Sequence, residues 1–109
     1  MNLWGNLYSR DTNQVILPAR TLTGSIPSQI VYLKNLEILD LSSNLISGKF
    51  PDELWTLTKL RILDLHNNNI SDSIPSDIEN LNNLTELYLY NNFLLGSIPE
   101  ELGLSLIHI

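Results

Sequence analysis

Prolines recur in this chain at one fixed interval, and that interval restricts the fold more than any other feature. Successive members are 24 residues apart: Pro27, Pro51, Pro75 and Pro99. Aliphatic residues keep the same spacing in four further columns: Val15, Leu39, Leu63 and Leu87; Leu17, Leu41, Leu65 and Leu89; Leu22, Ile46, Ile70 and Leu94; and Ile30, Leu54, Ile78 and Leu102. A fixed period of this length is typical of a repeat architecture, so the chain is predicted to consist of stacked copies of one unit.

Each unit combines a short strand with a short helical turn. Leu39 and Leu41 alternate with the period of two expected of a strand, whereas Leu33, Leu36 and Leu39 lie three apart, which suits a tight helical turn. One unit cannot cover its own apolar side, so neighbouring units must stack, with strands paired in parallel about 4.8 Å apart. The sequence predicts an α/β solenoid of about four 24-residue repeats, with a parallel concave sheet and 3-10 or short helical turns on the convex side.

Polar residues and glycines also follow the repeat. An asparagine ends three of the predicted strands, at Asn44, Asn68 and Asn92, and its amide has donors and an acceptor for backbone groups that the turning chain would bury unpaired. We predict that these residues form a structural ladder. The matching residue of the first unit, Arg20, is too long and charged for such an interior position, so the ladder is expected to begin at Asn44.

Glycine lies three residues before the proline in three units, at Gly24, Gly48 and Gly96, where a turn can require positive φ. Asp72 replaces glycine in the remaining unit. If that position also requires positive φ, the substitution is expected to cost about 1 kcal/mol of strain.

Composition excludes several classes of function. The formal net charge of −6 and the pI near 4.6 argue against nucleic acid and anionic membrane surfaces as partners. The chain contains no cysteine, which excludes disulfides and thiolate chemistry. No apolar run approaches the roughly 20 residues that span a bilayer, so we expect no membrane segment in this chain.

The repeat resembles a known family. Its template is carried by Leu33, Leu36, Leu39, Leu41, Asn44, Ile46, Gly48, Phe50, Pro51 and Leu54. This pattern is similar to the plant-specific leucine-rich repeat of receptor-like kinases and receptor-like proteins. The resemblance implies a binding module without a cofactor, located outside the cell or at the cell surface. It also implies a parent protein in the plasma membrane, whose kinase domain, where relatives have one, is absent from this chain.

The same resemblance divides the chain into three parts. Residues 1–12, with Trp4-Gly5, look like the remnant of an amino-terminal cap without its usual cysteine pair. Residues 13–104 are the repeats. Residues 105–109 are expected to form an irregular, truncated tail, because Ser105 and His108 stand where the repeat calls for leucine.

The strand residues that face away from the core are the candidate binding surface for a protein or peptide ligand, with a co-receptor as a further possible partner. They comprise Asp40, Ser42, Asp64, His66, Glu86, Tyr88 and Tyr90. Tyr88 and Tyr90 stand two apart and hence on one face, and exposed aromatic residues are enriched in binding hot spots. Two Asn-x-Ser/Thr triplets, at Asn69 and Asn83, are possible N-glycosylation sites in a secreted protein.

Catalysis and metal binding are not expected. Ser42, His66 and Asp64 resemble a triad on paper, but an open sheet face offers neither a pocket nor converging amide donors. His66 and Asp64 supply two metal ligands where zinc uses three or four. We instead expect His66 to be a variable residue exposed to solvent.

Three functions remain open at this point. The first is ligand perception by a receptor-like kinase or receptor-like protein. The second is a secreted protein that resembles polygalacturonase-inhibiting proteins, which are built from the same repeats. The third is a truncated gene product without independent function.

Overall fold

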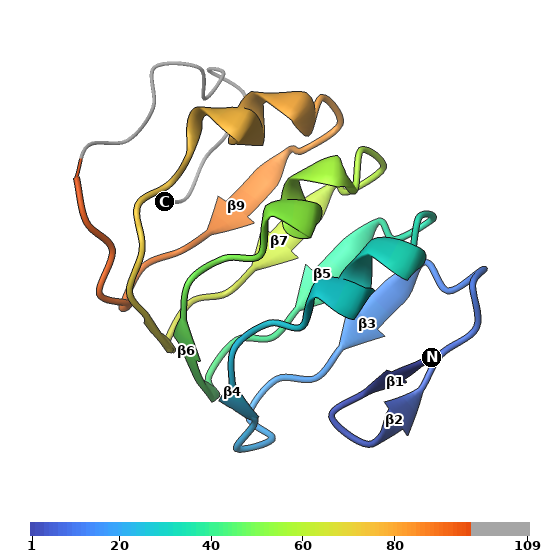
Figure 1. Cartoon of the computed structure of the whole chain (residues 1–109), viewed down its shortest axis with the longest axis horizontal. Coiled ribbons are helices and arrows are strands. Elements are labelled where there is room, and N and C mark those ends of the chain that lie inside the picture. Colours follow the sequence, from blue (N-terminus) through green and yellow to red (C-terminus); the bar gives the residue numbers. More distant parts are fainter. Residues whose placement is uncertain (97–109) are drawn as a thin grey trace.

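The computed structural model describes residues 1–96. Its concave sheet contains four parallel strands in the order β3-β5-β7-β9 (Figure 1). These are β3 (Gln14–Ile16), β5 (Ile38–Asp40), β7 (Ile62–Asp64) and β9 (Glu86–Tyr88). Val15 pairs with Leu39, Leu39 with Leu63, and Leu63 with Leu87, so every register step equals the 24-residue repeat. The predicted solenoid and its parallel sheet are confirmed.

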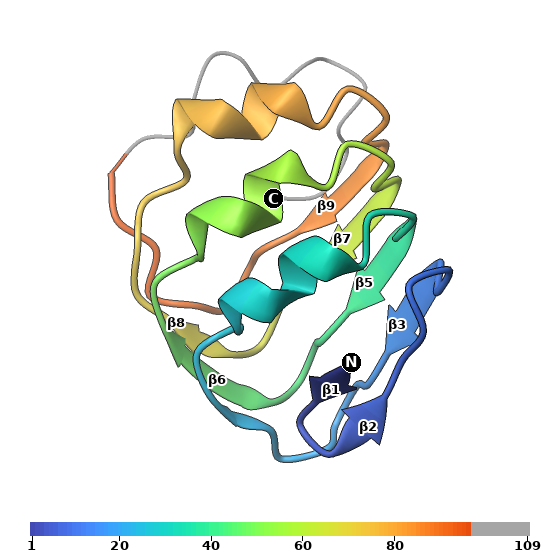
Figure 2. The ribbon, with the colours of Figure 1, turned by 45° about the vertical axis from the view of Figure 1, so that its right-hand side comes forward.

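Short 3-10 helices line the side opposite the concave sheet (Figure 2). They are η1 (Ser28–Tyr32), η2 (Asp52–Thr56) and η3 (Ser76–Asn80), and each follows the proline of its unit. Proline fixes φ near the helical value and needs no hydrogen-bonded N–H at such a start. After η1, the Leu36 N–H donates to the Leu33 carbonyl at 3.0 Å, so the tight turn predicted from the leucine spacing is also present.

A second parallel sheet connects the strands to the helices. It comprises β4 (Thr23–Gly24), β6 (Leu45–Gly48) and β8 (Asn69–Ile70), in the order β4-β6-β8. Here Thr23 pairs with Leu45 and Ser47 with Asn69, a step of 22 residues instead of 24. The sequence did not predict this sheet, because strands of two to four residues are too short to show an alternating pattern.

The amino-terminal segment forms an antiparallel hairpin of β1 (Asn2–Leu3) and β2 (Asn6–Leu7). Leu3 is fully buried and belongs to the common core, while the Trp4 Nε1–H donates to the Thr23 carbonyl at 3.0 Å. The hairpin therefore covers part of the apolar side of the first coil.

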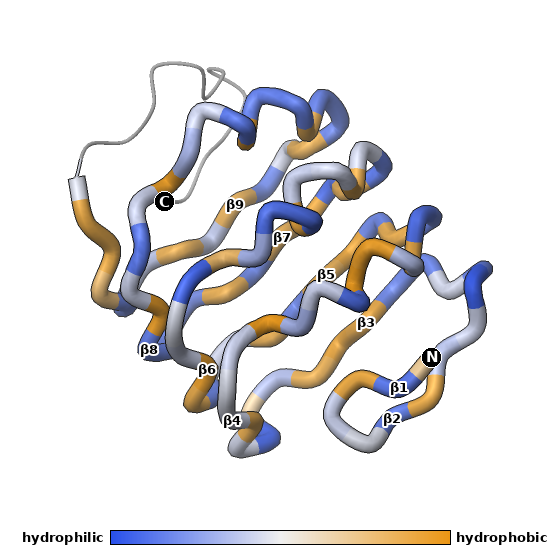
Figure 3. Tube along the Cα trace, in the orientation of Figure 1, coloured by the Kyte–Doolittle hydropathy of each residue, from blue (hydrophilic) through white to orange (hydrophobic). Residues whose placement is uncertain are grey.

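One continuous apolar core runs through the coils from Leu3 to Leu89. The strand and turn leucines of the repeat are its centre, and Figure 3 shows the hydrophobic residues of the strands in neighbouring coils side by side. Phe50 and Trp55 add an edge-to-face pair with ring centroids 5.3 Å apart. Ile98, Pro99, Leu102 and the predicted tail at 105–109 lie outside the described residues.

Asp72 corrects one prediction from the sequence. Gly24 and Gly48 have φ of 78° and 80°, as their column predicts, but Asp72 does not adopt positive φ. Its carboxylate instead accepts hydrogen bonds from the Phe50 N–H at 3.1 Å and the Ser73 N–H at 2.8 Å. The expected strain is absent because a side chain, rather than a left-handed backbone, satisfies this turn.

Within residues 1–96, no helix has the length and apolar character needed to cross a membrane.

Candidate ligand-binding concave face

The asparagine ladder holds the ends of the concave strands. The Asn68 Nδ2 donates to the carbonyls of Leu41, Leu65 and His66 at 3.0 to 3.3 Å, and its Oδ1 accepts from the Ile46 N–H at 3.0 Å. Asn44 and Asn92 make the equivalent bonds in their own coils. Because each amide bonds to its own coil and to the preceding one, the ladder fixes the spacing of the strands that carry the face.

The residue before each ladder position adopts left-handed backbone. Ala19, Ser43, Asn67 and Asn91 have φ between 53° and 57°. Asparagine tolerates this conformation better than most residues. Asn91 donates to the Asn67 Oδ1 at 2.7 Å, so these two residues form a second, exposed polar contact between coils.

Two neighbouring strands end in the same carboxylate contact. The Asp40 Oδ1 accepts from the Ser42 N–H at 3.0 Å and from the Ser42 hydroxyl at 2.7 Å. In the next coil, the Asp64 Oδ1 accepts from the His66 N–H at 3.2 Å and also contacts the His66 Nδ1. Each aspartate therefore stabilises the turn that follows its strand.

These contacts correct the expected exposure of two residues. Ser42 is only 5% exposed, so it offers little surface to a ligand. The His66 side chain is 21% exposed, because it packs between Asp64 and Tyr90 instead of facing solvent freely. The Asp64 carboxylate contacts the His66 imidazole at Nδ1, a contact that spacing alone did not predict. The Ser42 hydroxyl nevertheless donates to Asp40, which is not the arrangement of a catalytic triad.

Tyr90 is the most exposed of the predicted contact residues. It is 45% exposed, and its ring stacks on His66 with centroids 4.7 Å apart and planes at 17°. His66 and Tyr90 lie 24 residues apart and hence at the same position of neighbouring units, but this spacing does not predict the stack, because it does not determine side-chain rotamers. The stack holds a large aromatic surface in a fixed position at the open side of the sheet.

Tyr88 and Glu86 form a second fixed pair on the same strand. The Tyr88 hydroxyl donates to the Glu86 Oε1 at 2.6 Å. This hydrogen bond, followed by desolvation and the negative charge of Glu86, raises the pKa of Tyr88 above its usual value of 10.0. Tyr88 therefore stays neutral and acts as a hydrogen-bond donor on a face that carries Asp40, Asp64 and Glu86.

Other predicted sites lie elsewhere on the molecule. Asn69 is exposed on β8 in the second sheet, and Asn83 is exposed in the loop before β9, where its Nδ2 donates to the Thr58 carbonyl at 2.9 Å. Glycosylation at either site stays a prediction. Within residues 1–96, no three metal-ligating side chains come together.

Comparison with known protein families identifies leucine-rich repeats in this chain. Residues 16–70 match the family described as leucine rich repeat, and residues 58–104 match the family described as leucine rich repeats in two copies. No match was found among the curated proteins.

Three solved structures illustrate the relationship. The first is PEPR1 with AtPEP1, which is 38% identical with a TM-score of 0.82 over 88% of this chain and 14% of that chain. The second is the plant peptide hormone receptor RGFR1 in complex with RGF2, with 42% identity and a TM-score of 0.82 over 84% and 15% of the two chains. The third is the complex of BIR3 and SERK2 from Arabidopsis thaliana, with 43% identity and a TM-score of 0.76 over 80% and 47%.

This chain thus spans about one seventh of the PEPR1 and RGFR1 chains. The family matches together reach from residue 16 to residue 104, and as far as residue 96 they coincide with the coils that the structure describes. The fold is that of a binding module, and the chain belongs to the leucine-rich repeat family.

Proposed function

We propose that this chain is part of the extracellular ligand-binding region of a plant receptor-like kinase or receptor-like protein, with its parent in the plasma membrane. The chain takes part in signal perception by binding a peptide or protein on its concave face. The observation that carries the proposal is the exposed Tyr90 ring, fixed by its stack on His66 beside the Tyr88–Glu86 pair. A rigid aromatic side chain contributes contact area at a low entropic cost.

The related structures support this assignment. PEPR1 and RGFR1 were each solved with a partner, and RGFR1 is described as a plant peptide hormone receptor. The complex of BIR3 and SERK2 shows that a leucine-rich repeat chain similar to this one also takes part in an assembly of two proteins. A co-receptor is therefore a second class of partner for the present chain.

The size of the face favours a short ligand. Four strands about 4.8 Å apart, with about five residues of about 3.3 Å each, give roughly 300 Å² of concave surface. A standard protein partner covers about 800 Å² on each side. An extended peptide that crosses the strands fits the smaller area, and a larger partner needs additional repeats of the parent protein.

The test uses dodecapeptides selected by phage display against the full chain. We expect Tyr90→Ala to weaken binding of a selected peptide about tenfold or more, the effect of losing a hot-spot residue. Leu45→Ala is the control, because Leu45 is 51% exposed on β6 in the second sheet, away from the concave face, and it should change the affinity less than about twofold. Equal losses in both variants, or a loss in Leu45→Ala alone, would reject the concave face as the site.

A further inference from the structure

Basic side chains gather on one edge of the solenoid. Four of the six Lys and Arg residues lie in the loops that lead into the concave strands. We call this surface the basic flank; it consists of Arg10 before β3, Lys34 before β5, and Lys59 and Arg61 before β7. Figure 3 shows the hydrophilic tips of these loops following one another from coil to coil. The Lys59 Nζ donates to the Asn35 Oδ1 at 2.8 Å, which joins two neighbouring loops of the flank.

Acidic side chains are concentrated on the other surfaces. The concave strands carry Asp40, Asp64 and Glu86, and the helices η2 and η3 carry Asp52, Glu53, Asp77 and Glu79. On the flank itself, within the described residues, the acidic side chains are Asp11 and Glu37, against four cations. A protein with a net charge of −6 thus keeps one basic edge.

Two cations of the flank are free to receive a ligand. Within residues 1–96, the side chains of Arg10 and Lys34 make no hydrogen bond or ion pair. Arg61 instead pairs with Glu37 at 3.1 Å, with both side chains substantially exposed. An anion that binds Arg10 and Lys34 therefore breaks no existing ion pair.

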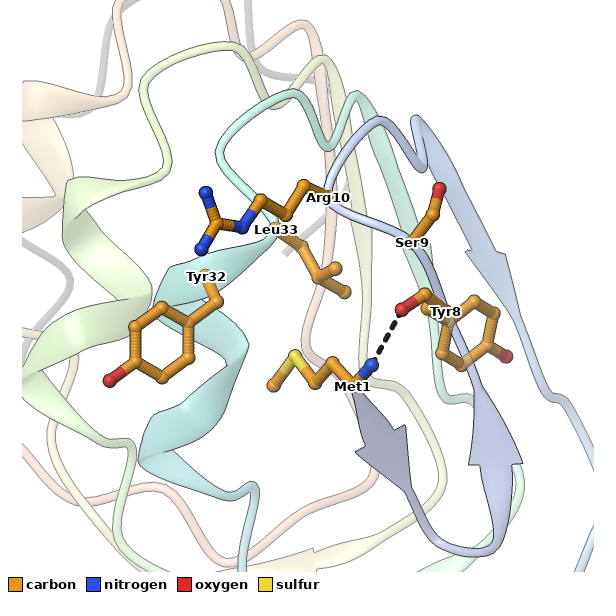
Figure 4. A pocket seen from close by; sticks show the side chains of 6 residues that line it. All are labelled: Met1, Tyr8, Ser9, Arg10, Tyr32 and Leu33. Atoms are coloured by element: carbon orange, nitrogen blue, oxygen red, sulfur yellow. Dashed lines mark hydrogen bonds between the residues drawn. The ribbon is translucent and has the colours of Figure 1, made fainter.

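Hollows lie directly beside these cations. One of about 470 Å³ is lined by Met1, Tyr8, Ser9, Arg10, Tyr32 and Leu33 (Figure 4). Figure 4 shows Arg10 reaching from the β2–β3 loop toward the end of η1, where Tyr32 lies. A second hollow, of about 310 Å³, shares Arg10 and Tyr32 and adds Asp11, Lys34 and Asn35. Arg10 and Tyr32 therefore stand between two adjoining depressions, one with apolar walls and one with Lys34 at its side.

We propose that the basic flank binds an acidic segment of a protein partner, independently of the concave face. Carboxylates of the segment contact Arg10 and Lys34, and an apolar or aromatic side chain packs against Tyr32 in the hollow beside Leu33. Arginine suits carboxylates because its planar donors can form two parallel hydrogen bonds. The acidic faces on either side of the flank would repel an anionic bilayer, whereas a narrow peptide segment reaches the cations without approaching those faces.

The experiment titrates the full chain with a fluorescent synthetic peptide that has four glutamates around one tyrosine. A second peptide with lysines in place of the glutamates controls for charge. The variants are the double substitution Arg10→Gln with Lys34→Gln, and the matched control Lys49→Gln, which removes a cation outside the flank. Glutamine keeps much of the length and polarity of the side chains, and thermal unfolding monitored by circular dichroism checks that each variant folds.

The acidic peptide should bind, and the lysine peptide should not. The double variant should weaken binding about tenfold or more, while Lys49→Gln should change it less than about twofold. Amide chemical shifts should move at residues 10–11 and 32–35. Equal loss in Lys49→Gln, unchanged binding in the double variant, or shifts confined to the concave strands would overturn the proposal.

Two further measurements separate this proposal from its alternatives. Binding to phosphatidylserine vesicles without binding to the acidic peptide would replace the protein partner by a membrane and overturn the proposal. Tyr90→Ala should leave the affinity for the acidic peptide unchanged. Failure of the flank and failure of the concave face are therefore distinguishable.

Discussion

The ring of Tyr90 stacks on the imidazole of His66 in the preceding coil, with centroids 4.7 Å apart. Because the Asp64 carboxylate contacts the His66 Nδ1, three side chains from two neighbouring coils are held together. We predict that Tyr90→Ala lowers the free energy of unfolding by about 1 kcal/mol, the usual contribution of an aromatic pair. Tyr90→Phe should keep most of this stabilisation, because phenylalanine retains the aromatic ring. Urea unfolding measures both values, and equal losses in the two variants would show that the stack contributes nothing.

The ladder should matter more for stability than any exposed contact. Asn68 is 6% exposed and bonds to four backbone groups. Asn68→Ala should therefore cost about 3 kcal/mol or more, because buried backbone groups lose their partners. Asn82→Ala, the same change in an exposed loop, should cost less than about 0.5 kcal/mol. Similar costs for the two variants in urea unfolding would refute the structural role of the ladder.

The left-handed positions offer a stabilising substitution. Ser43 has φ of 56°, whereas the corresponding residues of the next two coils are asparagines in the same conformation. Ser43→Asn should raise the free energy of unfolding by about 0.5 to 1 kcal/mol, because asparagine tolerates this backbone better. Ser47→Asn on β6, where φ is not positive, serves as the control and should not stabilise. A gain in both variants would point to a cause other than backbone conformation.

Replacing Asp72 by glycine, the residue that the other units have at this position, should lower the stability of the protein. Asp72→Gly removes the acceptors for the Phe50 and Ser73 N–H groups and should cost about 1 kcal/mol, since Asp72 does not have positive φ. Gly48→Ala should also cost about 1 kcal/mol, because Gly48 has φ of 80° and alanine adopts positive φ less readily than glycine. Thermal unfolding compares the variants. Stabilisation by Asp72→Gly would contradict this interpretation of the turn.

The raised pKa of Tyr88 has a consequence at high pH. The folded protein holds the phenolic proton more tightly than the unfolded chain, so the resulting stabilisation is present below the unfolded pKa of 10.0. It is lost as the pH rises through the higher folded pKa. Glu86→Ala should lower the pKa of Tyr88, because the hydrogen bond is its largest cause. An NMR titration of the Tyr88 ring tests this, and an unchanged pKa in the variant would exclude Glu86 as the cause.

Most of the fold could be predicted because it depends on periodic burial. The columns through Leu39 and Leu41 determine which residues enter the core, and the buried asparagine column follows from the need to satisfy backbone groups. The second sheet could not be predicted, because backbone hydrogen bonds at Thr23 and Leu45 leave no hydropathy signal. The turn at Asp72 could not be predicted either, because the same position of the repeat can hold a glycine with positive φ or an aspartate whose carboxylate accepts backbone hydrogen bonds.

The candidate site was predicted only as a set of positions. Spacing placed Tyr88 and Tyr90 on one face, but side-chain packing decided that Ser42 is buried and that His66 lies between two partners. The basic flank escaped prediction because only Arg10 and Lys34 share a position of the unit, and the next unit has Thr58 there, so no basic column runs through the repeats. Arg10, Lys34 and Lys59 come together only when the loops stack.

Hydrogen exchange of the full chain, with and without a selected peptide, tests the central claim most directly. If the concave face is the binding surface, the peptide should slow exchange in and around residues 86–90 and at residues 62–66 of the adjoining coil. The helices η1, η2 and η3 should exchange as they do in the free chain. Protection confined to those helices, or to the second sheet, would contradict the assignment of the concave face as the ligand-binding site.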